Sequence, residues 1–374
     1  MTPNEAYWQL LYHVGEVHLW DVKTARTLER ILAQHKEGIL HLLESPLVRR
    51  LTGLAQMGVK LIAGRFVTQY HRLAHSSHVG VIGGTLALRL KASDQETLTI
   101  LIAGLLHDLG HSAFAHDGER ALKWERNWCH ERAGKQKIRE DPQIRQALEL
   151  MNIDPEMVIR IISEEGRLGM IQNIADTLAY ILDDGRLAGV EANQDLVQRI
   201  AESFLSLDLE RGFQVRDSGP LQELLDHRAR LGAEIYHLFN NQLIQKSLLH
   251  LLFDAIRSRR LSLDLIETGV DAQVRQILDD TYRDHDDERL RSIHRILCGH
   301  VATELSQHWS ATIHPNGVQG GGNDGTLRYN IFDLGLHLKG KEIPVTIEGV
   351  PRRLHTIPSA EQLSKSTRVF TWIG

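Results

Sequence analysis

One segment, residues 95–107, restricts the fold more than any other because it is apolar almost all round. A surface helix keeps a polar face, whereas a helix without one belongs at the centre of a bundle. This segment ends in His107 and Asp108. Desolvating an unpaired charge costs on the order of several kcal/mol, so two ionisable side chains at a buried helix end need partners or a metal ion. The sequence therefore predicts a helical core with a polar site at one helix end.

Helical periodicity continues over most of the chain, from about residue 5 to residue 301. Residues 24–41 and 75–90 carry apolar side chains at three-to-four spacing or in dense runs, which is typical of buried helices. Ser45 and Pro46 have the form of an N-cap and a first helical residue, and predict a helix from there to Gly58. The fold class predicted is mainly α, a helical bundle.

Composition changes after about residue 306. Residues 314–325 are rich in glycine, and residues 327–332, 343–347 and 368–373 alternate as strands do. We predict a helical domain at 1–305, with its core at about 45–253. Residues 306–374 are predicted to form a glycine-rich loop and a small β-containing region. This region either binds a partner or shapes a pocket entrance, and the sequence does not choose between the two.

Bulk composition narrows the class of protein. The formal charge of −5 over 374 residues gives no reason to expect nucleic-acid or membrane binding. The two cysteines have no paired spacing, which excludes a disulfide framework or a thiolate zinc knuckle within the chain. No basic segment precedes an apolar run at the N-terminus, and no apolar stretch is long enough to span a bilayer. We expect a soluble cytoplasmic protein.

Further metal-ligating side chains lie on both sides of His107 and Asp108. His75 and Asp176 each belong to an apolar, helical segment. Two imidazoles and two carboxylates suit Mn, Fe, Zn, Ni or Mg, and leave coordination positions for water and a phosphate oxygen. From spacing alone, one divalent metal ion and a set of hydrogen-bonded core histidines are equally well supported.

The order and surroundings of these four residues resemble a known family. His75, His107-Asp108 and Asp176 match the H…HD…D signature of the HD superfamily of metal-dependent phosphohydrolases. The segments 45–51, 56–58, 72–80, 107–116 and 130–131 resemble its deoxynucleoside triphosphate triphosphohydrolase branch, which includes bacterial deoxyguanosine triphosphate triphosphohydrolases and eukaryotic enzymes that join a sterile alpha motif to an HD domain. The similarity runs from about Ser45 to Phe253.

The resemblance implies an enzyme with one divalent metal that releases nucleoside and triphosphate from a deoxynucleotide, and that forms homo-oligomers. It assigns metal ligands, catalytic residues and substrate contacts. These are His75, His107, Asp108 and Asp176 for the metal; Arg72, His111, His116 and the pair His130-Glu131 for the phosphates and proton transfer; and Gln56, Tyr180, Asp184, Arg228 and Tyr236 for the sugar and pocket.

The residues themselves give partial support to these roles. Histidine titrates near neutral pH, which suits general acid or base chemistry at a phosphate. Gly110 can bend the chain so that His116 faces the same cavity as His107. Asp176, Tyr180 and Asp184 have four-residue spacing, which puts them on one helix face. The alternatives are surface histidines and an ordinary polar stripe, and His78 is predicted to be a solvent-facing or supporting residue.

Two departures weaken the match to a triphosphate site. Thr177 stands where the family has a lysine, and residues 237–241 lack the family's basic cluster. Either Arg120, Lys123 or Arg132 supplies the charge, or the substrate has fewer phosphates, as for a nucleotidase or phosphodiesterase. A regulatory nucleotide-binding protein without turnover is the non-enzymatic alternative. An HD-type nuclease is a further alternative, but its basic groove would have to come from residues 257–260, which are more simply a solvated helix end.

Overall fold

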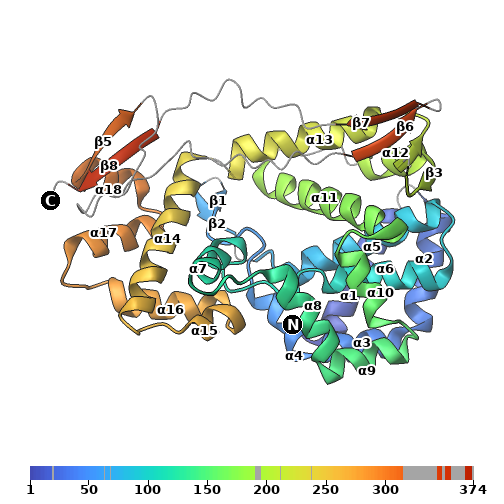
Figure 1. Ribbon diagram of the computed structural model, residues 1–374, viewed down its shortest axis with the longest axis horizontal. Helices are drawn as coiled ribbons and strands as arrows, with labels where there is room; N and C mark the ends of the chain where they lie inside the picture. Colours follow the sequence, from blue (N-terminus) through green and yellow to red (C-terminus); the bar gives the residue numbers. More distant parts are fainter. Residues whose placement is uncertain are drawn as a thin grey trace.

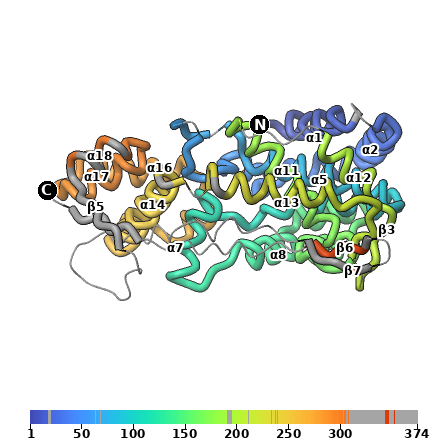
Figure 2. The backbone as a smooth tube through the Cα atoms, turned by 90° about the horizontal axis from the view of Figure 1, so that it is seen from above, coloured from blue at the N-terminus to red at the C-terminus, as the bar shows by residue number. Residues whose placement is uncertain are grey.

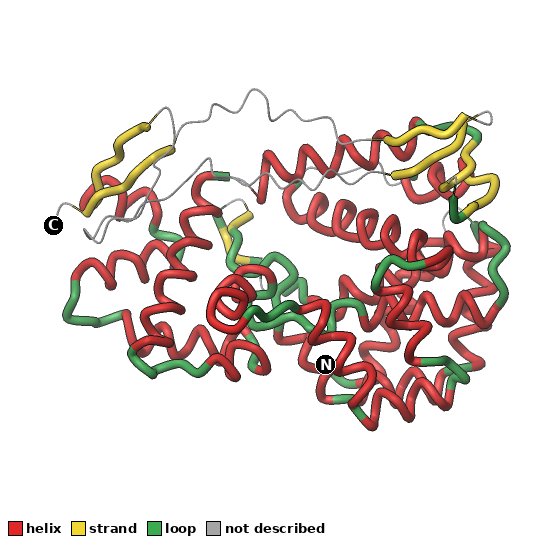
Figure 3. Tube along the Cα trace, in the orientation of Figure 1, coloured by secondary structure: helices red, strands yellow, loops and turns green. Residues whose placement is uncertain are grey.

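A computed structural model gives the structure of the chain (Figure 1). It describes residues 1–18, 21–62, 64–67, 69–189, 195–210, 212–236, 238–314, 343–347, 350–354 and 367–372. Helices make up most of this part, and its small sheets lie at opposite ends and near the middle of the molecule, as the tube coloured by secondary structure shows (Figure 3). The mainly α prediction is confirmed.

The elements are given in chain order. The first half contains α1 (Pro3–His18), α2 (Val22–Gln34), α3 (Lys36–Glu44), α4 (Pro46–Arg50), the 3-10 turn η1 (Leu51–Gly53), β1 (Leu61–Ile62), β2 (Arg65–Phe66), α5 (Arg72–Arg89), α6 (Asp94–Leu106), α7 (His116–Arg126), α8 (His130–Glu140), α9 (Pro142–Leu150), α10 (Pro155–Ile162) and α11 (Gly166–Ala188). The second half contains α12 (Leu196–Ser203), β3 (Phe204–Asp208), β4 (Gly212–Val215), α13 (Gly219–Leu231), the π-helical turn η2 (Gly232–Tyr236), α14 (Phe239–Arg257), α15 (Leu263–Thr268), α16 (Asp271–Tyr282), α17 (Glu288–Leu297), α18 (Val301–His308), β5 (Trp309–His314), β6 (Ile343–Ile347), β7 (Val350–Leu354) and β8 (Thr367–Trp372).

The central helices α5 and α6 begin at well-defined caps. The Ser93 hydroxyl accepts from the Glu96 backbone N–H at 3.2 Å, and the Glu96 side chain accepts in return from the Ser93 N–H at 2.8 Å, which completes a capping box for α6. The His71 imidazole accepts from the Ala74 N–H at 3.2 Å at the start of α5. Every residue of α6 from Thr97 to Leu106 is buried. The apolar segment therefore lies in the core, as its sequence predicts.

Two glycines let α5 and α6 cross closely. A Cβ atom on Gly104 would lie 2.4 Å from Gly80 Cα, and one on Gly80 would lie 2.6 Å from the Leu101 carbonyl oxygen. Backbone atoms cannot move aside as a flexible side chain can. This crossing fixes the position of His75 on α5 relative to His107 at the end of α6.

Gly104→Ala should therefore lower the free energy of unfolding by about 1–3 kcal/mol or more, the usual cost of overpacking a core. Urea denaturation followed by circular dichroism measures the change. The control is Gly15→Ala in α1, where an added Cβ meets nothing within 4 Å; there the helix propensity of alanine should stabilise by up to about 1 kcal/mol. An equal effect of the two substitutions would contradict close packing at the α5–α6 crossing.

The buried apolar residues form two clusters. The larger joins α1 to α6 with α8 to α13, and the smaller joins α14 to α17 with α7 and the loop before it. The chain passes from one to the other just after α6, since Leu109 belongs to the first cluster and Ala113 to the second. In the view from above, the helices α14, α16, α17 and α18 gather at one end of an elongated body and α1, α2 and α12 at the other (Figure 2).

The sequence predicts helix throughout residues 24–41 and again throughout residues 45–58, but neither range forms a single continuous helix. The first range breaks between α2 and α3 near His35. In the second, α4 ends at Arg50 and Ser45 makes no side-chain cap, so the predicted helix to Gly58 is wrong. The chain leaves the helical path because Ala55 pairs with His71 and the Arg72 N–H donates to Leu54 O at 2.9 Å. This pairing places Gln56 beside the start of α5.

Within the described residues, the strands form three small sheets. β3, β4, β6 and β7 make a four-stranded sheet in that order, with β6 parallel to β4, while β5 pairs with β8 and β1 with β2. The predicted strand at 343–347 is confirmed as β6, and the one at 368–373 corresponds to β8. The predicted strand at 327–332 and nearly all of the glycine-rich segment lie outside the described residues. The division at residue 305/306 stays a prediction, although β6 adds to a sheet begun within the helical part.

Candidate active site

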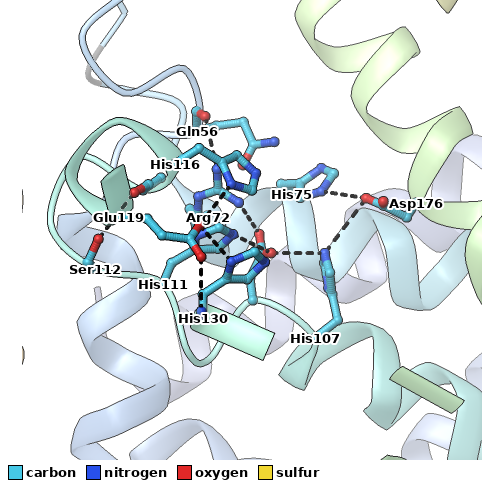
Figure 4. A network of polar contacts seen from close by, with 12 residues as sticks. Gln56, Arg72, His75, His107, His111, Ser112, His116, Glu119, His130 and Asp176 are labelled. Atoms are coloured by element: carbon cyan, nitrogen blue, oxygen red, sulfur yellow. Dashed lines mark hydrogen bonds and ion pairs between the residues drawn. The ribbon is translucent and has the colours of Figure 1, made fainter. Parts of the chain in front are cut away.

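The structure brings together the four predicted metal ligands from three helices. His75 lies in the first turn of α5, His107 and Asp108 follow α6, and Asp176 lies in the middle of α11. His75 Nε2 is 3.2 Å from Asp176 Oδ1, and His107 Nε2 is 3.3 Å from Asp108 Oδ1 and 3.7 Å from Asp176 Oδ1. Figure 4 shows the side chains of His75, His107 and Asp176 turned toward one another.

The chemistry of these donors fits a divalent metal. His107 Nδ1 is 2.7 Å from the Gly104 carbonyl oxygen, which can only accept, so this nitrogen carries the proton and Nε2 presents a lone pair to the two carboxylates. Burial disfavours an ionised Asp108, but Arg72, His107 and His111 outweigh it and hold the pKa of Asp108 well below its usual range. An ionised carboxylate is the form of Asp108 that metal binding requires.

Arg72 forms the other side of the site. It is 4% exposed, and its Nη1 donates to Asp108 Oδ2 at 2.6 Å. Its Nη2 lies 3.4 Å from the Gln56 carbonyl oxygen, while Arg72 Nε and Gln56 Oε1 are buried without a hydrogen-bond partner. A guanidinium with a spare donor beside the metal ligands is suited to an anionic oxygen.

Three histidines, His111, His116 and His130, lie together beside the predicted metal ligands, and the last two share one carboxylate. The rings of His111 and His130 stack with centroids 4.2 Å apart, and His116 lies edge-on to His111 at 4.6 Å. Glu119 Oε2 is 2.8 Å from His130 Nδ1 and 3.4 Å from His116 Nδ1. Burial opposes the charge on Glu119, but the hydrogen bonds from His116 and His130 prevail and lower its pKa.

Glu119, rather than Glu131, is the carboxylate beside His130. Glu131 is exposed, whereas Glu119 also accepts from the His130 backbone N–H at 3.2 Å. The sequence contains a signal for Glu119 that was missed, since it stands three residues after His116 on a helix, where side chains meet. His78, predicted to face solvent or support the site, is buried and paired with Asp183 at 2.9 Å.

Gly110 has a packing role here rather than serving as a bend. A Cβ atom at Gly110 would lie 1.9 Å from the His130 carbonyl oxygen and 2.6 Å from the Gly134 nitrogen. The absence of a side chain thus lets the start of α8 approach the loop after α6. This approach brings His130 into contact with His111.

The loop between His111 and His116 is strained and held from outside. Phe114 and Ala115 have φ of 58° and 51°, which non-glycine residues rarely adopt. The Phe114 N–H donates to Asp271 Oδ1 at 2.6 Å, and the other oxygen of Asp271 accepts from the Ala55 N–H at 2.8 Å. Arg50 Nη1 donates to the His111 carbonyl oxygen at 2.7 Å. Sequence reasoning missed Arg50 and Asp271, because no local pattern connects them with the histidines.

Asp271 also predicts a pH dependence of stability. Burial raises its pKa to about 6, against the opposing hydrogen bonds from Phe114 and Ala55. A raised pKa means that folding favours the protonated form, so its stabilising contribution is full below about pH 4 and is lost as pH rises through 6. Urea denaturation at several pH values should show wild type losing about 2–3 kcal/mol relative to Asp271→Asn over this range. Parallel curves for the two proteins would contradict it.

The predicted sugar pocket lies along α11 and the α13–η2 segment. Tyr180 and Asp184 follow Asp176 on α11, and the Tyr236 hydroxyl donates to Asp184 Oδ2. Burial raises the pKa of Asp184 to about 6, and burial also raises the pKa of Tyr180. Asp184 Oδ1 and Arg228 Nη1 are buried without a partner. Buried polar atoms are normally paired, so these two indicate room for polar groups of a ligand.

The residues that differ from the family pattern place little positive charge near the predicted metal ligands. Thr177 is buried and its hydroxyl donates to the Asn173 carbonyl oxygen at 2.9 Å. Asn241 is buried and its amide donates to Ile235 O and Leu61 O, while residue 237 lies outside the described part. The side chains of Arg120, Lys123 and Arg132 are exposed on α7 and α8. The basic residues at 257–260 are exposed at the end of α14, as expected of a solvated helix end.

No helix in the described residues combines the length and the apolar character needed to cross a bilayer.

Residues 72–202 match the family model described as HD domain. Human deoxynucleoside triphosphate triphosphohydrolase SAMHD1 is 34% identical over 107 residues, which is 25% of this chain and 16% of that protein. A deoxyguanosinetriphosphate triphosphohydrolase-like protein of Clostridium perfringens (strain SM101 / Type A) is 26% identical over 182 residues, 45% of this chain and 50% of that protein. The chain thus spans half or less of the length of these relatives.

A solved structure of similar fold extends over nearly the whole chain. The crystal structure of a phosphohydrolase from Bacteroides thetaiotaomicron superposes with a TM-score of 0.62 at 16% identity, and covers 90% of this chain and 96% of that one. At this identity the likeness concerns the fold. Residues 72–202 therefore match an HD domain, the chain has the fold of that solved phosphohydrolase, and over part of its length it is similar to deoxynucleoside triphosphate triphosphohydrolases.

Proposed function

We propose that the protein is a metal-dependent phosphohydrolase that acts on nucleotides, and specifically a deoxynucleoside triphosphate triphosphohydrolase that releases nucleoside and triphosphate. One observation carries the proposal. Buried polar atoms without a hydrogen-bond partner occur in both parts of the predicted site: Arg72 Nε and Gln56 Oε1 beside Asp108, and Asp184 Oδ1 and Arg228 Nη1 in the predicted sugar pocket. A ligand with both anionic oxygens and sugar hydroxyls satisfies them, since buried polar groups left unpaired are costly.

In this proposal His75, His107, Asp108 and Asp176 hold one divalent ion. The metal, when bound, supplies a Lewis acid for a phosphate oxygen and lowers the pKa of a water molecule. Mn, Fe, Mg, Zn and Ni all suit imidazole and carboxylate ligands.

The chain's own residues account for the remaining steps. Arg72 donates to a phosphate oxygen and offsets charge that develops on it. His130, with Nδ1 beside the ionised Glu119, keeps Nε2 free to take or give a proton. His111 and His116 line the same approach, and exposed His116 marks its solvent side. Tyr180, Asp184 and Tyr236 bind the sugar, where the carboxylate of Asp184 accepts from a hydroxyl.

A second candidate is hydrolysis of a less phosphorylated nucleotide by a nucleotidase or phosphodiesterase. Thr177, buried and bonded to its own helix, puts no positive charge beside Asp176. A triphosphate needs several charge-assisted contacts, and exposed Arg120, Lys123 and Arg132 would have to turn inward to provide them. A regulatory role through nucleotide binding without turnover is the remaining alternative.

A substrate panel separates these candidates. Purified protein with Mn²⁺ or Mg²⁺ is offered the deoxynucleoside and ribonucleoside mono-, di- and triphosphates, and the products are resolved by ion-exchange chromatography. Release of nucleoside and intact triphosphate from deoxynucleotides is the expected result. Orthophosphate from monophosphates alone would favour the nucleotidase. Nucleotide binding without any product would favour the regulatory protein.

A further inference from the structure

A second cluster of metal-ligating side chains lies outside the HD site, between the N-terminal helix and the core. It contains His13 and Glu16 of α1, and His78 of α5, with Asp183 of α11 behind His78. His13 and His78 are 9% and 6% exposed, and Asp183 is 7% exposed. One ligand atom from each of His13, Glu16 and His78 lies within 4.8 Å of the others.

Each ring nitrogen of His78 faces a carboxylate: Nδ1 faces Asp183, and Nε2 faces Glu16. His78 Nδ1 is 2.9 Å from Asp183 Oδ2, which also accepts from the Tyr70 hydroxyl. A carboxylate oxygen accepts from a ring nitrogen, so the His78 proton lies on Nδ1. In the neutral ring Nε2 is then a lone pair, directed at Glu16 Oε2 at 3.8 Å.

The same oxygen of Glu16 also faces His13. His13 Nδ1 is 2.9 Å from Glu16 Oε2, and the rings of His13 and His78 stack at 4.3 Å with an angle of 6° between their planes. Nδ1 of His13 and Nε2 of His78 thus both lie near the same carboxylate oxygen, Glu16 Oε2. A proton on both rings would place two positive charges face to face in a buried position, which is costly. A single cation shared by the three groups satisfies all of them.

We propose that His13, Glu16 and His78 bind a second divalent transition-metal ion, and that Asp183 orients His78 through Nδ1. Two imidazole nitrogens and one carboxylate oxygen are ligands that Zn²⁺, Fe²⁺ and Mn²⁺ accept. The carboxylate–histidine–metal arrangement is the usual support for a ligating imidazole. The ion would fasten α1 to α5 and α11, one helical turn beyond His75.

A comparison within the chain supports this choice of cluster. Asp279, His294 and Cys298 also lie within ligand distance of one another, but Arg275 already donates to Cys298 Sγ at 3.0 Å and to Asp279 Oδ1 at 3.1 Å. A guanidinium in that position repels a metal ion. At the α1 cluster the nearest arginine, Arg186, reaches only the outer oxygen of Glu16, Oε1, at 3.4 Å. Glu16 Oε2 stays available to a metal.

Metal content per chain tests the proposal. Full-length protein is dialysed against Zn²⁺, then against metal-free buffer, and analysed by inductively coupled plasma mass spectrometry. Wild type should hold two equivalents, and His13→Ala and Glu16→Gln should each hold one. Glu5→Gln is the matched control, because Glu5 is an exposed glutamate of the same helix, and it should hold two.

A second measurement isolates the new site from the HD site. In an Asp108→Ala background, which removes an HD ligand, Zn²⁺ should still raise the melting temperature, and Co²⁺ should give a visible absorption band. Both effects should disappear on adding Glu16→Gln, which keeps the size of the side chain. Stoichiometry and melting that do not change with His13 or Glu16 would overturn the proposal. Neither measurement depends on turnover, so the outcome is independent of the proposed activity.

Discussion

Asp108→Ala should remove the metal ion from the HD site and lower turnover at least about a thousandfold. A bound metal stabilises transition-state charge by several kcal/mol, and about 1.4 kcal/mol corresponds to a factor of ten in rate. Asp108 also carries the 2.6 Å ion pair with Arg72, so the substitution removes a metal ligand and frees the guanidinium together. Turnover with the best substrate of the panel and metal content by mass spectrometry measure both effects.

The loss of that ion pair needs its own control. Removing one partner of a buried pair can cost about 3–5 kcal/mol of stability, so melting curves must show that the variant is folded at the assay temperature. Asp108→Asn keeps the shape and should lose activity as well. Asp94→Ala, an exposed aspartate at the other end of α6, should leave turnover unchanged. Full turnover by metal-free Asp108→Ala protein would refute the proposed mechanism.

His130→Gln should lower kcat by about 10²–10⁴-fold, the usual contribution of a positioned acid or base. Glutamine keeps a polar side chain of similar length but does not titrate near neutral pH. Since His130 is held by Glu119 and stacks on His111, the substitution should change kcat much more than KM. The pH profile of kcat should lose one of its limbs. A fall confined to KM would mean that His130 binds substrate and does not transfer a proton.

Two glutamates provide a matched comparison for His130. Glu119→Gln should lower kcat by about 10–100-fold, the usual effect of losing a carboxylate that orients an imidazole. The sequence resemblance assigns that role to Glu131, yet the structure places Glu119 at 2.8 Å from His130 and Glu131 at the surface. The loss with Glu119→Gln should therefore exceed the loss with Glu131→Gln. The reverse order would restore the assignment made from the sequence.

Helices with strong local signals could be predicted from the sequence. The apolar run at residues 95–107 is a local feature, and it predicts α6 within a residue at each end. The spacing of Asp176, Tyr180 and Asp184 predicted one helix, and α11 carries all three. The HD motif likewise predicted four metal ligands, and the structure brings these four side chains together, since each lies on or beside a helix of the core.

Features fixed by distant residues could not be predicted in this way. The segment after Arg50 reads as helix, but Ala55 pairs with His71 and Asp271 instead. Glu119 and His130 are eleven residues apart on different helices, and only the bend between α7 and α8 brings them together. His78 is buried because α1 packs against α5, and no sequence motif predicts this packing. In each case a long-range contact outweighed the local pattern.

The contacts of Arg50 and Asp271 bear on where this protein can be divided. The HD match ends at residue 202, and every proposed metal ligand precedes that point. The His111–His116 loop, however, is fastened by the Ile266 carbonyl and by Asp271, and Arg50 bonds at the same time to the carbonyls of Glu267 and Thr268. A fragment cut at the motif boundary would keep its ligands and lose the frame that shapes the loop. A fragment that keeps this frame must therefore extend beyond residues 72–202, at least as far as Asp271 at the start of α16.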